Sequence, residues 1–214
     1  MRVALTGGSA LLEERLRALG IRVLRVPVIR IAPPRDPLAL KRAVREPFDL
    51  AVLASRNAER AFLKAGGKGA RVGPGSSASL VRILRRRKLR GRIVLLPRSQ
   101  VSPEALPRAL RRMGALVRCV TSYRTLPVRL SRRSLSALAG ADAVTFASAS
   151  AASSLAASFR REGFSVRGIR AVSIGPETSR ALRREGFRVA AGARPSSQAG
   201  LVRAVRKALK GTAS

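Results

Sequence analysis

Two hydrophobic patterns alternate along the chain: short, nearly uninterrupted apolar runs, and longer stretches in which leucines recur every three or four positions. A run such as residues 2–5 is typical of a strand buried on both faces. The leucine spacing of residues 11–19 is typical of an amphipathic helix, which Gly20 would end. A second apolar run follows at residues 21–23. The pattern therefore predicts a strand, helix, strand unit and an α/β protein.

The same unit recurs in the second half of the chain. Residues 92–95 form an apolar run, and a leucine-bearing helical pattern follows and ends at Gly114. Beyond this unit, residues 49–58 align without a gap with residues 142–151, since each segment runs from an Asp through apolar positions to a Ser. The chain is predicted to be an internal repeat of two similar halves.

The repeat places Ser55 and Ser148 at equivalent positions, each after an apolar run and before a helical pattern. Each is expected at the carboxyl end of a strand and at a helix N-terminus, the edge of an open α/β sheet where ligands bind. Both could also be plain helix caps. The turn Gly175-Pro-Glu-Thr178 follows another strand, and its backbone N–H groups and threonine hydroxyl could face an anion.

The segment of residues 73–80 aligns with the second half in two ways. It matches residues 175–182, in which case Ser76 takes the place of the threonine in the Gly-Pro-x-Thr turn. Alternatively, residues 74–82 match residues 195–203, and the first half is then one strand and one helix shorter. Both alignments remain open from the sequence, although segment length slightly favours the second.

Two extended, proline-ended segments, residues 26–34 and 120–127, are equivalent in the repeat and are predicted to be paired linker strands. They divide the chain into a discontinuous domain of residues 1–30 and 127–214 and a shortened domain of residues 34–122. The predicted fold is two similar small parallel-sheet α/β domains joined by a two-stranded linker, with the chain crossing a cleft twice.

Charge points to an anionic partner, because 44 Lys and Arg face only 11 Asp and Glu, a formal net charge of +33. The basic residues are spread along the whole chain, and no motif interleaves them with aromatic residues. Sequence-specific nucleic-acid binding is therefore not expected, although salt-sensitive, nonspecific contact with nucleic acid is. The run Arg85-Arg-Arg-Lys88 is interpreted as the solvated end of a helix.

The residue types present restrict the possible chemistry. The chain has no His, which excludes Ser-His-Asp and Cys-His catalysis and leaves Tyr, Asp, Glu, Lys or water for proton transfer. Cys119 stands alone, and no metal-ligand spacing is present, so neither a disulfide nor a metal site is expected. Residues 7–9, Gly-Gly-Ser, lack the rest of a nucleotide-binding motif.

Membrane insertion and secretion are not expected from the sequence. No apolar run approaches the roughly 18 residues that a membrane-spanning helix needs. The N-terminal segment, MRVALTGGSALLEERL, passes from an apolar run directly into a charged helical pattern without a cleavage site. The chain is therefore interpreted as a mature cytoplasmic protein.

Several short motifs occur in an order and spacing that, taken together, resemble the uroporphyrinogen-III synthase family along nearly the whole chain. They are residues 49–58, 94–98, 123–125, 145–148, 174–178 and 194–201. The resemblance implies two α/β domains with the active site in the interdomain cleft. It also implies a monomeric, cofactor-independent lyase of porphyrin and heme biosynthesis, which dehydrates and cyclises hydroxymethylbilane, a polyanionic linear tetrapyrrole, with inversion of ring D.

The resemblance also implies site residues. Tyr123 matches the linker tyrosine of the family, the candidate proton donor that assists departure of the substrate hydroxyl, although it could instead pack the linker. Arg98 could grip a substrate carboxylate in a bidentate manner or remain a solvated surface charge. The other candidate substrate-binding residues, all near helix N-termini, are Ser55, Asn57, Ser148, Ser150, Gly175 and Thr178. The alternative function is a noncatalytic two-domain binding protein for an anionic ligand or nucleic acid.

Overall fold

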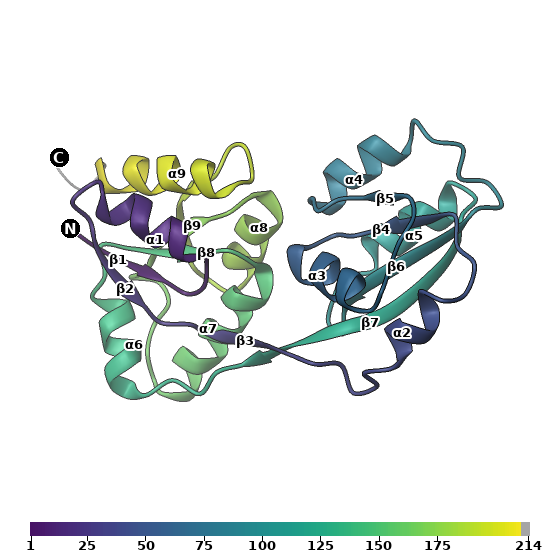
Figure 1. Cartoon of the computed structure of the whole chain (residues 1–214). Coiled ribbons are helices and arrows are strands. Elements are labelled where there is room, and N and C mark those ends of the chain that lie inside the picture. Colours follow the sequence, from purple (N-terminus) through teal and green to yellow (C-terminus); the bar gives the residue numbers. More distant parts are fainter. Residues whose placement is uncertain (211–214) are drawn as a thin grey trace. The chain divides into compact units, whose positions relative to one another are not determined.

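A computed structural model describes residues 1–210 of the 214-residue chain. The chain divides into two compact units, one made of Met1–Arg30 together with the chain from Leu126 onward, and one made of Ile31–Thr125 (Figure 1). Each unit has its own sheet with helices packed on it. The predicted class, two parallel-sheet α/β domains, is confirmed, whereas the domain limits inferred from the sequence stay a prediction.

The first unit contains a five-stranded sheet in the order β10-β9-β8-β1-β2, in which every pair is parallel. Its strands are β1 (Arg2–Leu5), β2 (Arg22–Arg25), β8 (Ala143–Phe146), β9 (Arg170–Ser173) and β10 (Arg188–Gly192). Its helices are α1 (Ala10–Arg17), α6 (Arg132–Ala139), α7 (Ala149–Arg161), α8 (Pro176–Arg184) and α9 (Gln198–Lys210).

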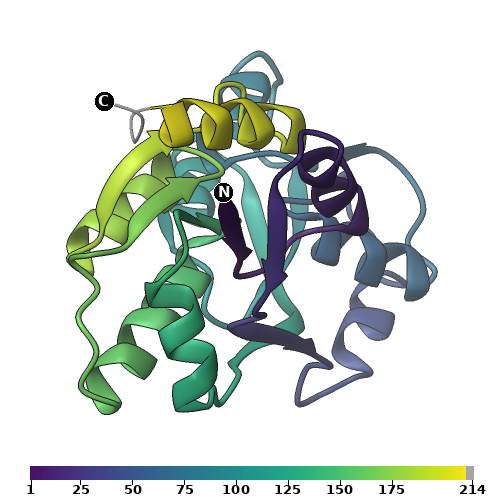
Figure 2. The same ribbon diagram turned by 90° about the vertical axis from the view of Figure 1, so that its left-hand side faces the viewer.

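Helices cover both faces of this sheet (Figure 2). Val3 and Leu5 of β1 pack with residues of α1 and α9, among them Val205. Ala4, which points to the other face, belongs to the core formed with α6, α7 and α8, including Leu155. Because both faces are buried, the strands read in the sequence as continuous apolar runs rather than as an alternation of apolar and polar residues.

The second unit contains a five-stranded sheet in the order β3-β7-β6-β4-β5. Its strands are β3 (Ile29–Ala32), β4 (Leu50–Val52), β5 (Arg71–Val72), β6 (Ile93–Ser99) and β7 (Leu116–Pro127), and its helices are α2 (Ala39–Ala43), α3 (Arg56–Lys64), α4 (Ser77–Leu84) and α5 (Ala105–Arg112). Helices α4 and α5 pack on one face around Leu84 and Leu110, and Phe62 of α3 packs on the other. The predicted linker segments lie side by side as β3 and β7, and Val128 N donates to Val28 O at 3.0 Å.

The structure settles which of the two alignments applies. Strand β5 pairs with β4 as β9 pairs with β8, and α4 packs on α5 as α9 packs on α1. Ser76 caps α4 by accepting from Ser79 N at 3.2 Å, and Ser197 makes the same contact with Gly200 N at 3.1 Å. Residues 74–82 therefore correspond to residues 195–203. Within the second unit nothing corresponds to α8 and β10, so Ser76 does not replace Thr178.

An aspartate makes the same backbone hydrogen bond at the equivalent position of both units. Asp49 Oδ2 accepts from Ile93 N at 2.7 Å, and Asp142 Oδ2 accepts from Arg2 N at 2.6 Å. In each case the carboxylate pairs with the first backbone N–H of the neighbouring strand. The hydrogen bond from Ile93 N, followed in importance by that from Arg92, lowers the pKa of Asp49 below its ordinary value of 3.8.

This shift predicts a pH-dependent contribution of Asp49 to stability. Because the folded-state pKa is depressed, the contribution is fully present above about pH 4, the unfolded pKa, and is lost as the pH falls through the folded value. The melting temperature of Asp49→Asn should therefore lie below that of the wild type at pH 7, and the gap should close in strong acid. Thermal melts between pH 7 and pH 2 measure it. Glu14→Gln, at an exposed carboxylate, serves as control, and a gap for Asp49→Asn that stays constant with pH would contradict the assignment.

Candidate active site

The carboxyl ends of parallel strands meet at one edge of each sheet, and the residues predicted to bind substrate lie at these edges. In the second unit, Ser55 follows β4, Arg98 lies near the end of β6, and Tyr123 lies on β7. The β-ladder pairs Ala51 with Leu95 and Ser99 with Tyr123. Ser55 and Tyr123 therefore lie at about the same level along the strand direction, on opposite sides of β6.

The hydroxyls of Ser55 and Tyr123 are in direct contact. Ser55 Oγ lies 3.0 Å from Tyr123 Oη, and either hydroxyl can be the donor. Ser55 is also the N-cap of α3, where its Oγ accepts from Ala58 N at 3.1 Å. Both side chains are half-buried. Asn57, the second residue of α3, lies in the same first turn, so three of the predicted residues gather at this helix N-terminus.

The first unit repeats this arrangement without the tyrosine. Ser148 caps α7 and accepts from Ala151 N at 3.2 Å, with backbone angles of −161° and 157° against −153° and 156° at Ser55. Ser150 lies in the first turn of α7. The equivalence of the two serines, expected from the repeat, is therefore visible in their geometry.

Gly175 and Thr178 lie at the start of α8, which follows the strand next to β8, so the N-termini of α7 and α8 are neighbours at this edge. The first intrahelical hydrogen bond of α8 runs from Ser179 N to Gly175 O at 3.0 Å, which leaves the N–H groups of Glu177 and Thr178 free of that ladder. A Cβ at Gly175 would lie 2.4 Å from Ser196 Oγ, so the close approach of that loop favours glycine. The Thr178 side chain is buried at the edge.

Arg98 is engaged within its own unit. Its guanidinium pairs with Glu104 at 2.5 Å, donates to the carbonyl oxygens of Ser102 and Pro103, and leaves the side chain only 13% exposed. These contacts hold the loop that joins β6 to α5 against the end of β6. A substrate carboxylate would have to compete with Glu104 for this guanidinium, so the structure groups Arg98 with the loop rather than with the hydroxyls of Ser55 and Tyr123.

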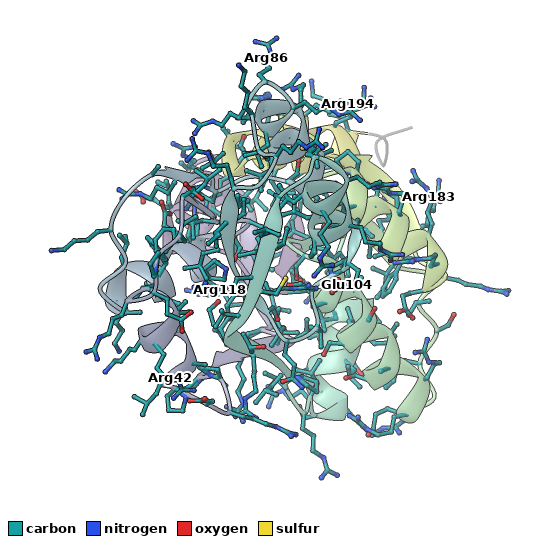
Figure 3. All side chains as sticks on the ribbon, turned by 90° about the vertical axis from the view of Figure 1, so that its right-hand side faces the viewer. Arg42, Arg86, Glu104, Arg118, Arg183 and Arg194 are labelled. Carbon is teal, nitrogen blue, oxygen red and sulfur yellow. The ribbon has the colours of Figure 1, made fainter. Side chains whose placement is uncertain are left out.

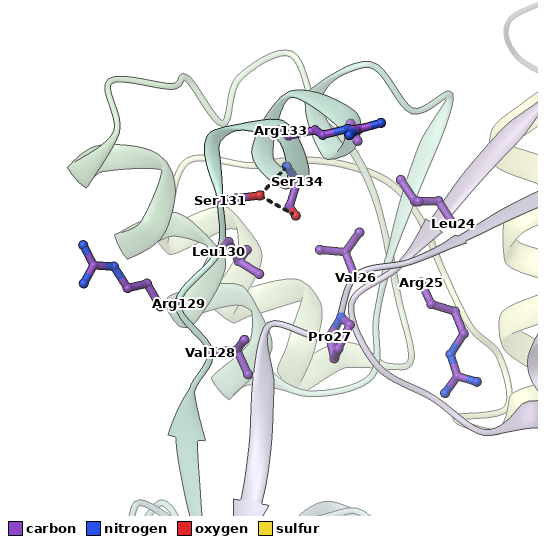
Figure 4. Close-up of a pocket in the computed structure, with 11 residues that line it drawn as sticks. Leu24, Arg25, Val26, Pro27, Val128, Arg129, Leu130, Ser131, Arg133 and Ser134 are labelled. Atoms are coloured by element: carbon purple, nitrogen blue, oxygen red, sulfur yellow. Dashed lines mark hydrogen bonds between the residues drawn. The ribbon is translucent and has the colours of Figure 1, made fainter.

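Two hollows within the units lie apart from these residues. One, with a volume of about 490 Å³, is in the first unit, where Val26 and Leu130 form an apolar floor and Arg25, Arg129 and Arg133 lie at its rim (Figure 4). The other, about 570 Å³, is in the second unit, lined among others by residues of α2 and by residues 118–121 of β7. Neither contains a residue predicted to bind substrate.

Positive charge is spread over both units. Figure 3 shows nitrogen-tipped side chains on helices and strands of each unit, with Arg86 and Arg183 among those that extend outward. Acidic side chains engage some of them, as Glu46 does with Arg118 at 2.8 Å. The 11 acidic residues are too few to pair with the 44 basic ones, so most of this charge is not neutralised by an acidic side chain. The chain as a whole is therefore strongly positive, which favours an anionic ligand.

Within residues 1–210, no group of three or more His, Cys, Asp or Glu side chains is placed to hold a metal ion. No helix in the same range is long and apolar enough to cross a membrane.

Two residues that shape the site carried no usable signal in the sequence. Glu104 holds Arg98 from six positions away across a turn, a spacing that belongs to no regular period. Ser122 lies at an irregularity of β7, where the partners of Arg98 and Ser99 are Thr121 and Tyr123. Such a bulge depends on pairing with another strand, so a single strand sequence does not reveal it.

Comparisons with known proteins agree with the α/β fold. The family model described as "Uroporphyrinogen-III synthase HemD" matches residues 10–72 and 59–203. Among solved structures, a mutant uroporphyrinogen III synthase from Thermus thermophilus is 21% identical with a TM-score of 0.65, each chain being 99% covered. The wild-type enzyme of that bacterium gives a TM-score of 0.54 at 21% identity over the whole of both chains.

A uroporphyrinogen-III synthetase from Helicobacter pylori is 15% identical, with a TM-score of 0.60 over 96% of this chain and 99% of that one. A search of curated proteins found no match. At these identities the structures establish the shared fold, and the family model, which matches most of the sequence, establishes membership. The chain belongs to the uroporphyrinogen-III synthase family.

Proposed function

We propose that this protein is an enzyme that converts hydroxymethylbilane into uroporphyrinogen III, with loss of water and inversion of ring D. The family membership supports the overall reaction. The observation that carries the proposal is the contact between Tyr123 Oη and Ser55 Oγ, 3.0 Å apart at the ligand-binding edge of a parallel sheet. It provides a phenol beside a helix N-terminus in a chain that has no His.

The proposed chemistry begins with proton transfer from Tyr123 to the terminal hydroxyl of the substrate. The C–O bond breaks, water leaves with the electron pair, and the pyrrole nitrogen, which keeps its hydrogen, supplies electrons to form a protonated azafulvene. The substituted α-carbon of ring D attacks it and forms the spiro intermediate. The older bond from that carbon to its neighbouring methylene then breaks, the methylene bonds to the unsubstituted α-carbon of ring D, and loss of the hydrogen on that carbon completes the inverted ring. The steps involve no net oxidation or reduction, so the proposal requires no redox cofactor.

Positioning supplies much of the rate enhancement in such a reaction, because the bound geometry decides which carbon attacks. The acetate and propionate arms of the substrate are carboxylates, and helix N-termini bind carboxylates through backbone N–H groups and cap hydroxyls. We assign this role to the first turns of three helices, through Asn57 on α3, Ser148 and Ser150 on α7, and Gly175 and Thr178 on α8. Arg98 acts in the proposal by holding the loop after β6.

The shortened second unit changes how many such turns are available. The first unit offers the N-termini of α7 and α8, whereas the second offers that of α3 and has no counterpart of α8. We infer that the excess of basic side chains takes over part of the carboxylate binding that the missing turn would supply. We further propose that the enzyme works as a cytoplasmic monomer.

The test is conversion of freshly generated hydroxymethylbilane, followed by oxidation and separation of the type I and type III porphyrin isomers. Type I forms without an enzyme and is the internal blank. We expect an excess of type III that is proportional to protein concentration. Type I alone, from protein shown by circular dichroism to be folded, would overturn the proposed function.

A further inference from the structure

The hydrogen bond between Ser55 and Tyr123 can be donated by either hydroxyl, and the surrounding contacts are compatible with donation from Ser55. A serine hydroxyl can accept two hydrogen bonds and donate one. Ser55 Oγ already accepts from Ala58 N at 3.1 Å, while its own proton has no partner other than Tyr123 within the described residues. Donation from Ser55 to Tyr123 Oη gives the serine proton an acceptor and leaves the tyrosine proton free for a third group.

The backbone of β7 directs the tyrosine ring toward α3. The ladder with β6 pairs Arg98 with Thr121 and then Ser99 with Tyr123, so that Ser122 is left over as a bulge. Ser122 Oγ donates to Arg98 O at 3.3 Å, and Gln100 N donates to Tyr123 O at 3.2 Å. Bulges of this kind change the direction in which the following side chain points. Both partners in the contact are therefore held in position, Ser55 by its role as the cap of α3 and Tyr123 by the bulge in β7.

We propose that Ser55 is a positioning residue for Tyr123: its hydroxyl donates to the phenol oxygen and stabilises the phenolate that remains after proton transfer. The inference rests on the proposed function. The Tyr123 proton goes to the departing hydroxyl, which leaves as water. The phenolate then accepts the Ser55 hydrogen bond close to the positive end of α3, and recovers a proton when the unsubstituted α-carbon of ring D, which forms the last new bond, loses its hydrogen.

This role differs from the one expected from the sequence, in which Ser55 binds a substrate carboxylate directly. A residue that binds the substrate in the ground state and the transition state alike changes mainly KM, whereas one that stabilises only the phenolate changes kcat. The two roles are also separated by their dependence on Tyr123, since a positioning residue has no effect once the group it positions is gone.

The experiment is a double-mutant cycle on type III formation with Ser55→Ala, Tyr123→Phe and the double variant. Ser55→Ala alone should lower kcat about ten- to hundredfold with little change in KM, the range for losing a hydrogen bond to a charged group. Ser55→Thr, which keeps the hydroxyl and the cap, should recover most of the activity. In the Tyr123→Phe background, Ser55→Ala should have no further effect on kcat.

A matched control removes a helix cap elsewhere. Ser131 caps α6 in the first unit by accepting from Ser134 N at 3.2 Å, whereas Tyr123 belongs to the second unit. Ser131→Ala should lose a similar amount of stability and keep the wild-type kcat. An equal loss from Ser55→Ala with and without the Tyr123 hydroxyl, or a rise in KM alone, would overturn the positioning role.

A spectroscopic readout separates this inference from the proposed function. The chain has one Tyr and no Trp, so its tyrosine fluorescence comes from Tyr123 alone. Ser55→Ala should change the intensity and lifetime of that fluorescence, and Ser131→Ala should not. If Ser55→Ala leaves the fluorescence unchanged, the contact itself is refuted. If the fluorescence changes and the wild type makes no type III isomer, the contact stands, and the proposed function is refuted together with the catalytic role of Ser55.

Discussion

Tyr123→Phe should lower kcat for type III formation about a hundredfold, near the lower end of the range for losing a positioned general acid. The ring remains and keeps its packing, while the only phenolic proton in the chain is removed. KM should change little, because the substrate carboxylates are held elsewhere in the proposal. Steady-state kinetics with separation of the porphyrin isomers measures both constants.

The control for this prediction is the fold of the variant. Far-UV circular dichroism and the melting temperature of Tyr123→Phe should match those of the wild type within the loss expected for one hydrogen bond, about 1 kcal/mol. An unchanged kcat in a folded variant would show that water or another group protonates the leaving hydroxyl. A large rise in KM alone would instead identify Tyr123 as a substrate-binding group.

Phe62→Ala should destabilise the second unit by about 3–5 kcal/mol, the usual cost of truncating a buried phenylalanine. Phe62 is a residue of α3, and its fully buried side chain packs with Leu53 and Leu95. Its ring packs edge-on against Phe48 with 6.1 Å between centroids. In this unit, α3 is held on the sheet largely by that side chain. Since α3 carries Ser55, the variant should also lose activity.

Urea unfolding measures the effect in one unit at a time. Tyr123 lies in the second unit, so tyrosine fluorescence follows that unit, while circular dichroism follows both. The fluorescence midpoint of Phe62→Ala should fall, and the matched variant Leu63→Ala should shift it little, because Leu63 is 49% exposed on the same helix. Equal shifts for the two variants would contradict the role assigned to Phe62.

The repeat allowed much of the fold to be predicted from the sequence. Strands buried on both faces appear as apolar runs, and a serine at the end of such a run marks both a strand end and a helix start. Ser55 and Ser148 were therefore placed correctly as caps at equivalent edges. These features depend on neighbours within a few residues, which is the range over which a sequence pattern is informative.

The features that the sequence could not supply depend on pairing between distant segments. The correct alignment of residues 74–82 becomes clear only from the position of β5 beside β4. The engagement of Arg98 depends on a turn that brings Glu104 back to β6. The contact of Tyr123 with Ser55 requires a bulge in β7 and a ladder in which β6 lies between β7 and β4. None of these pairings produces a periodic pattern in the sequence near the residues involved.

The strands at the outer ends of the two sheets have a consequence for self-association. These four strands are β10 and β2 in one sheet and β3 and β5 in the other. Each carries an exposed arginine, at Arg188, Arg22, Arg30 and Arg71 respectively. Strand β5 has only two residues, and the register of β10 shifts within its length. Short, irregular and charged edges are poor templates for the edge-to-edge addition of a second chain, so part of the chain's positive charge protects it against β-aggregation.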